Sequence, residues 1–243
     1  MFQAVEASLR RLATDYIDLF WVHAWDQITP VDEVMRGLDD LVHQGKVLHL
    51  GISDAPAWWT AQADVLADLR GWTRFVGLQV EYSLIERTVE RELVPMANAL
   101  GLGVLAWSPL KNGVLTGKYH GHSANASGRM GSDLFKEFVP EQARTERIVS
   151  AVKSIADRIG RSLAQVALAW LRYRSAPVIP ILGARKLSQL EDNLRSLTLE
   201  VTPDDVKLLD ETSQIDLGFP YELYAKESLR SLIGGGMQDH LIV

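Results

Sequence analysis

Short apolar runs alternate with longer amphipathic stretches along most of the chain. Each run is apolar at nearly every position, as a strand buried on both faces of a sheet requires. Alternation of such runs with helical stretches is typical of parallel β-strands joined by helical crossovers. The pattern predicts five strands, at Ile17 to Val22, Val47 to Ile52, Phe75 to Val80, Gly103 to Ala106 and Val178 to Ile181.

Helix start signals lie between the predicted strands. Thr29-Pro30 predicts an N-cap followed by proline in the first helical turn, and we expect this helix to end near Gly45. Thr202-Pro203 repeats the same signal, and Ser162 with Gln165 three residues later predicts a capping box. The connections between the strands are therefore expected to be helical.

The order of strands and helices predicts a (β/α)8 barrel of the TIM-barrel type, incomplete, with about five of the eight βα units present. Such a sheet has two open strand edges. We expect residues 1–243 to form a single partial barrel domain, because one barrel of this length is common and no linker composition divides the chain. Leu110 to Arg147 predicts a long functional loop, and the chain beyond Gly218 predicts a tail packed across a barrel end.

Composition narrows the class of function. Apolar residues make up 47% and charged residues 23%, as in ordinary globular proteins, and the net charge of −6 is not gathered into one run. We therefore expect no nucleic-acid partner, and no apolar run approaches the ~20 residues of a membrane span. Without cysteine there is neither a disulfide nor a thiolate metal site. The N-terminal residues lack a signal pattern, which favours a cytoplasmic location.

Polar and aromatic residues recur at the carboxyl ends of the predicted strands. In a barrel these ends meet on one rim, where the reactive groups gather. A buried strand gains nothing by ending in such residues, so their recurrence predicts a shared polar site. A lone histidine is more often satisfied by a neighbouring backbone group, so only the whole set of strand-end residues predicts a site. The set comprises His23, Ser53 and Asp54, Gln79 and Tyr82, Trp107 and Ser108, and Gly183 and Arg185.

Five longer motifs surround these residues, and they are Tyr16-Ile-Asp-Leu-Phe-Trp-Val-His23, Gly51-Ile-Ser-Asp54, Leu78-Gln-Val-Glu-Tyr82, Trp107-Ser-Pro-Leu110 and Gly183-Ala-Arg-Lys-Leu-Ser-Gln-Leu-Glu-Asp-Asn193. In order and spacing they resemble successive motifs of the aldo-keto reductase family. The resemblance covers almost the whole chain, from the third helix of the family's barrel onward. It implies an NAD(P)H-dependent oxidoreductase that reduces small-molecule aldehydes or ketones to alcohols by hydride transfer.

The resemblance assigns the nicotinamide half of a cofactor site to the ends of the second, third and fourth strands. Ser53 and Gln79 supply donor and acceptor groups for the carboxamide. Asp54 stands where the family usually has Asn, and because an ionised aspartate cannot donate, its carboxamide contact is altered or dropped. Trp107 takes the place of the aromatic ring that stacks on the nicotinamide. A core tryptophan is the alternative interpretation of Trp107.

The resemblance assigns the phosphates and the adenosine of the cofactor to segments later in the chain. The loop after the fourth strand would pass the pyrophosphate with its backbone N–H groups, through Ser108, Pro109, Leu110, Gly113 and Leu115. Arg185 at a helix N-terminus predicts an anion site for the adenosine 2′-phosphate, which favours NADP(H) over NAD(H). An unpaired surface arginine is the alternative. The other residues assigned to the cofactor are Gly183 and Ala184, beside the phosphate, and Gln189, Asp192 and Asn193, at the adenosine.

Three further features concern the substrate and metals. Trp25, close to His23 in the chain, is the candidate for substrate contact. Trp58-Trp59 predicts packing of a helix against the barrel. His120 and His122 have the spacing of a metal pair, but no third ligand is evident, so we expect no metal site.

The family's chemistry uses a tyrosine, a lysine, an aspartate and a histidine, and only the histidine has a matching context here, at His23. A free tyrosine has a pKa near ~10 and needs a neighbouring cation to act as an acid near neutral pH. The resemblance places the other three residues before Met1. Three interpretations remain open: an oxidoreductase whose sequence starts late, an inactive NADP(H)-binding or redox-sensing module similar to potassium-channel β subunits, and a non-functional fragment. The sequence leaves the particular substrate and the oligomeric state open.

Overall fold

The computed structural model of the chain describes residues 1–118, 141–233 and 235. The chain consists of two compact units, Met1–Ser213 and Gln214–Val243. The first unit holds the sheet and most helices, and the second holds α9 (Tyr221–Tyr224) and α10 (Glu227–Ile233). The expectation of a single domain, and of a tail packed across a barrel end, stays a prediction.

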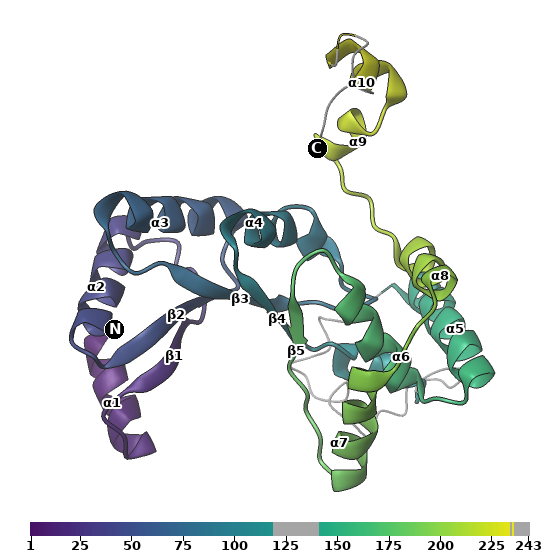
Figure 1. Cartoon of the computed structure of the whole chain (residues 1–243), viewed down its shortest axis with the longest axis horizontal. Coiled ribbons are helices and arrows are strands. Elements are labelled where there is room, and N and C mark those ends of the chain that lie inside the picture. The colour runs from purple at the N-terminus through teal and green to yellow at the C-terminus, as the bar shows by residue number, and fades with distance from the viewer. Residues whose placement is uncertain (119–140, 234, 236–243) are drawn as a thin grey trace. The chain divides into compact units, whose positions relative to one another are not determined.

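Five parallel strands form one open sheet in the order β1-β2-β3-β4-β5, which is also their order in the chain (Figure 1). Each strand starts at the predicted residue, and the differences lie at the carboxyl ends. The strands are β1 (Ile17–Val22), β2 (Val47–Ser53), β3 (Phe75–Glu81), β4 (Gly103–Trp107) and β5 (Val178–Pro180).

Helices connect the strands, as the sequence pattern predicts. They are α1 (Phe2–Leu12) before β1, α2 (Val31–His43), α3 (Ala57–Arg70) and α4 (Leu93–Leu100) in the first three connections, α5 (Gln142–Ile159) and α6 (Leu163–Trp170) in the fourth, and α7 (Leu187–Leu194) and α8 (Pro203–Ser213) after β5. Consecutive parallel strands with helical crossovers make an unclosed part of a (β/α)8 barrel. The predicted fold class is confirmed.

Two of the predicted helix starts are confirmed. Ser162 Oγ accepts the N–H of Gln165 at 3.2 Å at the start of α6, and Thr202 Oγ1 accepts the N–H of Asp205 at 3.2 Å at the start of α8. The expected capping box is only half formed, because the Gln165 side chain donates to Asp192 at 2.6 Å and does not return to Ser162.

The predicted cap at Thr29 is wrong. Its hydroxyl donates to the carboxylate of Asp26, and the N–H groups of Ile28 and Thr29 donate to the same carboxylate at 3.0 and 2.9 Å. Asp26 thus forms a local turn that holds Thr29, and Pro30 becomes the N-cap of α2.

The long loop predicted from Leu110 to Arg147 is shorter than expected. Helix α5 already begins at Gln142, and its buried residues Ile148, Val152 and Ile155 recur at helical spacing. Residues 119–140 lie outside the described part of the chain, and so do His120 and His122.

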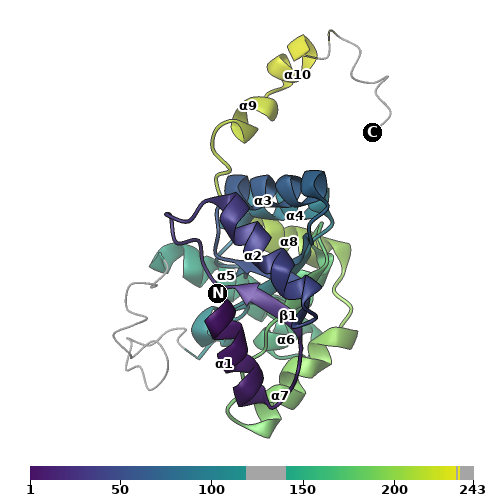
Figure 2. The ribbon, with the colours of Figure 1, turned by 90° about the vertical axis from the view of Figure 1, so that its left-hand side faces the viewer.

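Among the described residues of Met1–Ser213, helices cover one face of the sheet and leave the other face uncovered. Ile52, Leu78 and Val104 lie in one row of the register and are fully buried. Within Met1–Ser213, helices α2, α3 and α4 lie on that side of the sheet (Figures 1 and 2). The next row, Gln79, Leu105 and Ile179, points to the opposite face by alternation, and Ile179 is 58% exposed there. Gln79 belongs to this face, and Ser53, its partner in the register, is 2% exposed.

A row of glycines on the uncovered face makes room for one large ring. Gly51, Gly77 and Gly103 are paired in register, and Trp21 is paired with Gly51. The Trp21 indole lies against the first two glycines, because a Cβ added at Gly51 would approach the ring to 2.4 Å, and one at Gly77 to 3.1 Å. An added Cβ at Gly103 would meet nothing closer than the Val76 carbonyl oxygen at 3.9 Å.

We predict that Gly51→Ala lowers the free energy of unfolding by about 2 kcal/mol or more, because the methyl group forces the indole off the sheet. Urea denaturation followed by circular dichroism measures the effect. Gly103→Ala is the matched control in the same register row, and it should lower the free energy of unfolding much less than Gly51→Ala does. Trp21→Leu should suppress the loss caused by Gly51→Ala, whereas an unchanged loss in that background would contradict the explanation.

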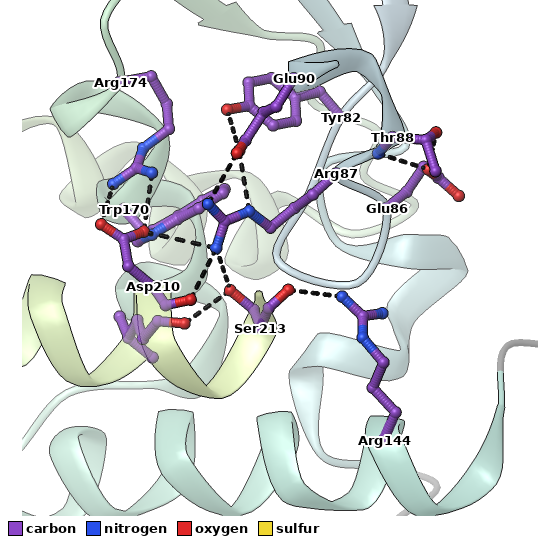
Figure 3. Close-up of polar contacts among 11 residues, drawn as sticks. Tyr82, Glu86, Arg87, Thr88, Glu90, Arg144, Trp170, Arg174, Asp210 and Ser213 are labelled. Atoms are coloured by element: carbon purple, nitrogen blue, oxygen red, sulfur yellow. Dashed lines mark hydrogen bonds and ion pairs between the residues drawn. The ribbon is translucent and has the colours of Figure 1, made fainter. Parts of the chain in front are cut away.

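A buried polar cluster ties the loop after β3 to α6 and α8 (Figure 3). The Arg87 guanidinium, in a residue only 8% exposed, donates to both oxygens of the Glu90 carboxylate at 2.8 and 2.7 Å. It also donates to the Asp210 carbonyl at 2.9 Å and to Ser213 Oγ at 2.7 Å. Glu90 accepts the Tyr82 hydroxyl at 2.6 Å. Burial, and then the charge of Glu90, raise the pKa of Tyr82.

Trp170 of α6 is the centre of the same cluster. The Arg174 guanidinium lies 4.0 Å from its ring centroid and the Arg87 guanidinium lies 5.2 Å away, within the range of cation–π attraction. The indole N–H donates to Asp210 at 2.8 Å, and Arg174 donates to both oxygens of that carboxylate at 2.7 and 3.1 Å. Tyr82 is therefore a structural residue and not a member of the rim site, because its hydroxyl is buried and bonded to Glu90.

We predict that Arg87→Met lowers the free energy of unfolding by about 2 kcal/mol or more, because the half-buried Glu90 carboxylate is left without its cation. Tyr82→Phe keeps the ion pair and should cost about 1 kcal/mol, the usual contribution of one hydrogen bond. Chemical denaturation of both variants tests the ranking. Equal losses in the two variants would show that the ion pair does not dominate the cluster.

Candidate active site

The carboxyl ends of β2, β3 and β4 bring the predicted rim residues together. Ser53 is paired with Gln79 in the register, and Glu81 is paired with Trp107. The N–H of Asp54 donates to the Gln79 carbonyl at 3.3 Å, which continues the β2–β3 pairing beyond the end of β2. Parallel strands in register end on the same edge, so these side chains share one rim.

Asp54 links β2 to β4 across the end of β3. The Trp107 indole N–H donates to Asp54 Oδ1 at 3.2 Å, and the Ser53 hydroxyl donates to Asp54 Oδ2 at 3.2 Å. Asp54 has a φ of 47°, a left-handed conformation that aspartate tolerates better than most residues. Sequence reasoning assigned both residues to the site but did not foresee this bond. The aspartate in place of asparagine was the available signal.

Three side chains assigned to the site remain without a protein partner. His23, Gln79 and Arg185 make no side-chain hydrogen bond or ion pair to another residue within the described ranges. His23 and Arg185 are exposed and Gln79 is half-buried. A polar group that the fold leaves unpaired at a strand end is available to a ligand.

The loop after β4 is held in left-handed backbone at several positions, with φ of 52° at Ser108, 44° at Lys111, 53° at Asn112 and 89° at Gly113. The N–H groups of Lys111 and Gly113 donate to the Ser108 and Leu110 carbonyls at 2.8 and 2.9 Å. The Asn112 N–H donates to Ser108 Oγ at 3.3 Å. These donors bond within the loop, and the predicted pyrophosphate contact stays a prediction.

The other assigned residues of this loop lie against the core. Leu115 is fully buried and its N–H donates to the Leu110 carbonyl at 3.2 Å. Pro109 is buried and Leu110 is half-buried. The side chains of Pro109 and Leu115 are therefore not accessible to a ligand, whereas part of Leu110 is.

Lys111 and Glu81 form a buried ion pair that the sequence did not reveal. Lys111 Nζ lies 2.8 Å from Glu81 Oε1 and 3.9 Å from Glu86 Oε2, and Lys111 is only 5% exposed. Burial raises the pKa of Glu81, the bond and charge of Lys111 lower it, and the charges of Glu86 and Asp54 raise it. No local pattern shows that a loop lysine points inward, so only the fold could reveal the pair.

The segment after β5 presents an exposed arginine at a helix start. Gln189 Oε1 accepts the N–H groups of Arg185 and Lys186 at 3.0 and 3.3 Å, which caps α7. Gly183 and Ala184 are exposed, and a Cβ added at Gly183 would meet nothing within 4 Å. The space beside Arg185 is therefore open to an anion.

Asp192 and Asn193 are engaged within the chain. The Asp192 carboxylate accepts from Ser162 Oγ at 2.7 Å and from Gln165 Nε2 at 2.6 Å, which joins α7 to the start of α6. Asn193 is buried. The contacts of both residues to an adenosine stay predictions.

Trp25 lies on the helix side of β1. Its ring packs edge-on against Trp58, with centroids 5.4 Å apart and planes at 88°. It lines a cavity of about 440 Å³ together with Val22, Val34 and Trp59. The predicted helix packing is confirmed for Trp59, which is buried in the core, but is wrong for Trp58, which is 59% exposed. The role of Trp25 in substrate contact stays a prediction.

Within residues 1–118, 141–233 and 235, no group of three or more His, Asp or Glu side chains has a metal-binding arrangement. Over the same ranges, no helix combines the length and apolarity needed to span a bilayer.

A parallel sheet with helical crossovers and polar side chains on its carboxyl rim is the arrangement of (β/α)-barrel enzymes. The sequence model of the aldo/keto reductase family matches residues 1–214. The chain belongs to the aldo/keto reductase family.

Curated relatives include several oxidoreductases. The chain is 38% identical over 230 residues to an aryl-alcohol dehydrogenase (NADP+) of Phanerodontia chrysosporium, an alignment covering 94% of this chain and 60% of that protein. It is 38% identical over 217 residues to a norsolorinic acid reductase of Emericella nidulans, covering 89% and 54%. A putative aryl-alcohol dehydrogenase of Saccharomyces cerevisiae is 34% identical over 224 residues, covering 90% and 58%. The chain thus spans between half and two thirds of the length of these relatives.

We predict that Lys111→Met destabilises the protein in a pH-dependent way. The loss of the lysine raises the pKa of Glu81 further above its ordinary value of 4.5. A raised carboxyl pKa contributes stability that is present below the ordinary value and is lost as pH rises through the folded-state pKa. The variant should therefore approach wild type at about pH 4 and fall behind it at about pH 7.

Urea midpoints at the two pH values, each compared with wild type, measure this effect. The double variant Lys111→Met, Glu81→Gln is the control, and its deficit should not grow with pH because the titrating carboxyl is gone. A deficit in the single variant that is the same at both pH values would contradict the assignment to Glu81.

Proposed function

We propose that this chain is, or forms part of, an NADP-dependent oxidoreductase that reduces aldehydes or ketones to alcohols. The observation that carries the proposal is that the Gln79 side-chain amide, without a partner among the described residues, and the Trp107 indole share one rim, together with the exposed Arg185 at the start of α7. Family membership and the NADP(+) in the name of one relative support it.

The rim suits a nicotinamide ring and its carboxamide. Gln79 offers one carbonyl acceptor and two amide donors, and Ser53 keeps acceptor capacity after donating to Asp54. The Trp107 ring supplies a flat apolar surface at little cost in side-chain entropy. These groups would bind the carboxamide and fix which face of the ring meets the substrate. NADPH, when bound, supplies the hydride for the reduction.

The start of α7 suits the phosphate end of the same cofactor. The Arg185 guanidinium is exposed, and its planar fork matches phosphate geometry. Gly183 leaves open space beside it, and Gln189 holds the backbone of the turn. A charged donor at this position favours NADP(H) over NAD(H), because only NADP(H) carries a 2′-phosphate.

His23 is the catalytic candidate, since it is exposed, unpaired and placed directly after β1. Its role here is to orient the substrate carbonyl by a hydrogen bond. Tyr82 cannot deliver the proton, because its hydroxyl is buried and bonded to Glu90. Aromatic aldehydes are the first substrates to test, because two of the relatives are named as aryl-alcohol dehydrogenases.

We propose a cytoplasmic location and no nucleic-acid or membrane partner, from composition alone.

We predict that the 243-residue chain binds NADPH and that Arg185→Ala weakens this binding about tenfold, the effect of losing one charged hydrogen-bonding group. Binding of NADH should be weak and nearly unchanged in the variant, since NADH lacks the 2′-phosphate. Fluorescence titration of both cofactors measures the dissociation constants. Arg36→Ala is the matched control, because Arg36 is an exposed arginine of α2 outside the proposed site.

Each outcome is decisive. An NADPH affinity that Arg185→Ala leaves unchanged would contradict the phosphate assignment. A folded chain that binds neither cofactor would contradict the proposed function. NADPH binding without oxidation of the cofactor by a panel of aromatic aldehydes would favour the inactive binding module over the enzyme.

A further inference from the structure

The contact between Asp54 and Trp107 gives the aspartate a function of its own. Its two carboxylate oxygens each accept one donor, the indole N–H of Trp107 and the hydroxyl of Ser53. The Trp107 bond joins residues 53 positions apart in the chain and passes over the end of β3. We propose that Asp54 is a positioning residue that holds the Trp107 indole in the orientation required for cofactor stacking, which rests on the proposed function.

The backbone places the carboxylate where this bond can form. Asp54 follows the last residue of β2 in a left-handed conformation, and its N–H is bonded to the Gln79 carbonyl at 3.3 Å. Position and direction of the side chain are therefore set by the β2–β3 pairing. Trp107 is the last residue of β4 and is only half-buried. It is not among the partly buried residues that pack against the core of the described chain, so the bond to Asp54 is the contact that fixes its ring.

The chemistry favours a carboxylate for this task. An indole N–H is a donor only, and an ionised acceptor makes a stronger hydrogen bond than a neutral one. An asparagine could accept with one oxygen but would turn two N–H donors toward Ser53 or the ligand. With Asp54 engaged, carboxamide recognition falls to Gln79 and Ser53. Asp54 therefore fixes the orientation of the Trp107 ring and does not bind the ligand directly.

The first measurement uses the cofactor-free chain. Labelling with 15N-indole tryptophan gives one signal for each of the seven tryptophans, and Trp107→Phe identifies the signal of Trp107. Asp54→Gly removes the carboxylate, and Asp54→Asn keeps one acceptor oxygen. Both residues tolerate the left-handed backbone, so the two variants form a matched pair. Asp18→Ala, which removes an exposed carboxylate of β1, is the control.

We expect Asp54→Gly to shift the Trp107 signal and to speed its hydrogen exchange about threefold to tenfold, the range for the loss of one hydrogen bond. Asp54→Asn should restore most of the protection, and Asp18→Ala should leave the signal unchanged. The other six indole signals serve as internal references for a general loss of structure. A Trp107 signal that is the same in Asp54→Gly and in wild type would overturn the proposal.

The second measurement tests the consequence for the cofactor. Asp54→Gly should weaken NADPH binding about tenfold, and Asp54→Asn should bind as well as wild type or better. In the Trp107→Phe background the same Asp54→Gly change should have little further effect, because Phe has no N–H to hold. An undiminished effect in that background would show that Asp54 acts directly on the ligand, which overturns the positioning role. Failure of wild type to bind NADPH would reject the proposed function instead, while hydrogen exchange still decides whether Asp54 holds the ring.

Discussion

The parallel register of β2, β3 and β4 is the constraint on which the rest of this structure depends. It pairs Ser53 with Gln79 and Glu81 with Trp107, so residues from three separate segments share one rim. The same register aligns the glycine row that accommodates the Trp21 ring. Because side chains alternate between the faces of a strand, a slip of one residue would move these groups to the helix side. The site and the packing of the uncovered face therefore follow from one pairing pattern.

Buried charges hold the loops that continue from this rim. Arg87 and Glu90 join the loop after β3 to α8, and Lys111 brings the loop after β4 back onto Glu81. Taking such pairs out of water costs much of what their attraction returns, so they contribute more to a defined geometry than to stability. Both pairs lie next to strand ends that carry site residues.

The residues of the candidate site fall into two groups by what they already contact. Three of them are hydrogen-bonded within the chain. Asp54 bonds the Trp107 ring, Gln189 caps the start of α7, and Asp192 joins α7 to the start of α6. The side chains of Gln79 and Arg185 have no hydrogen-bond or ion-pair partner among the described residues. A site of this kind separates the groups that bind from the groups that set geometry.

The sequence by itself determined the start of every strand, the parallel α/β class, the starts of α6 and α8, and that Ser53, Gln79 and Trp107 lie near the ends of neighbouring strands. Those features follow from hydrophobic periodicity and local capping, which act over a few residues. It did not determine that Asp26 captures Thr29, that Trp25 packs on Trp58, or that Lys111 points inward. Nor did it show that Asp54 bonds Trp107. Such contacts join distant segments or depend on the path of a loop, so only the tertiary structure decides which donor meets which acceptor.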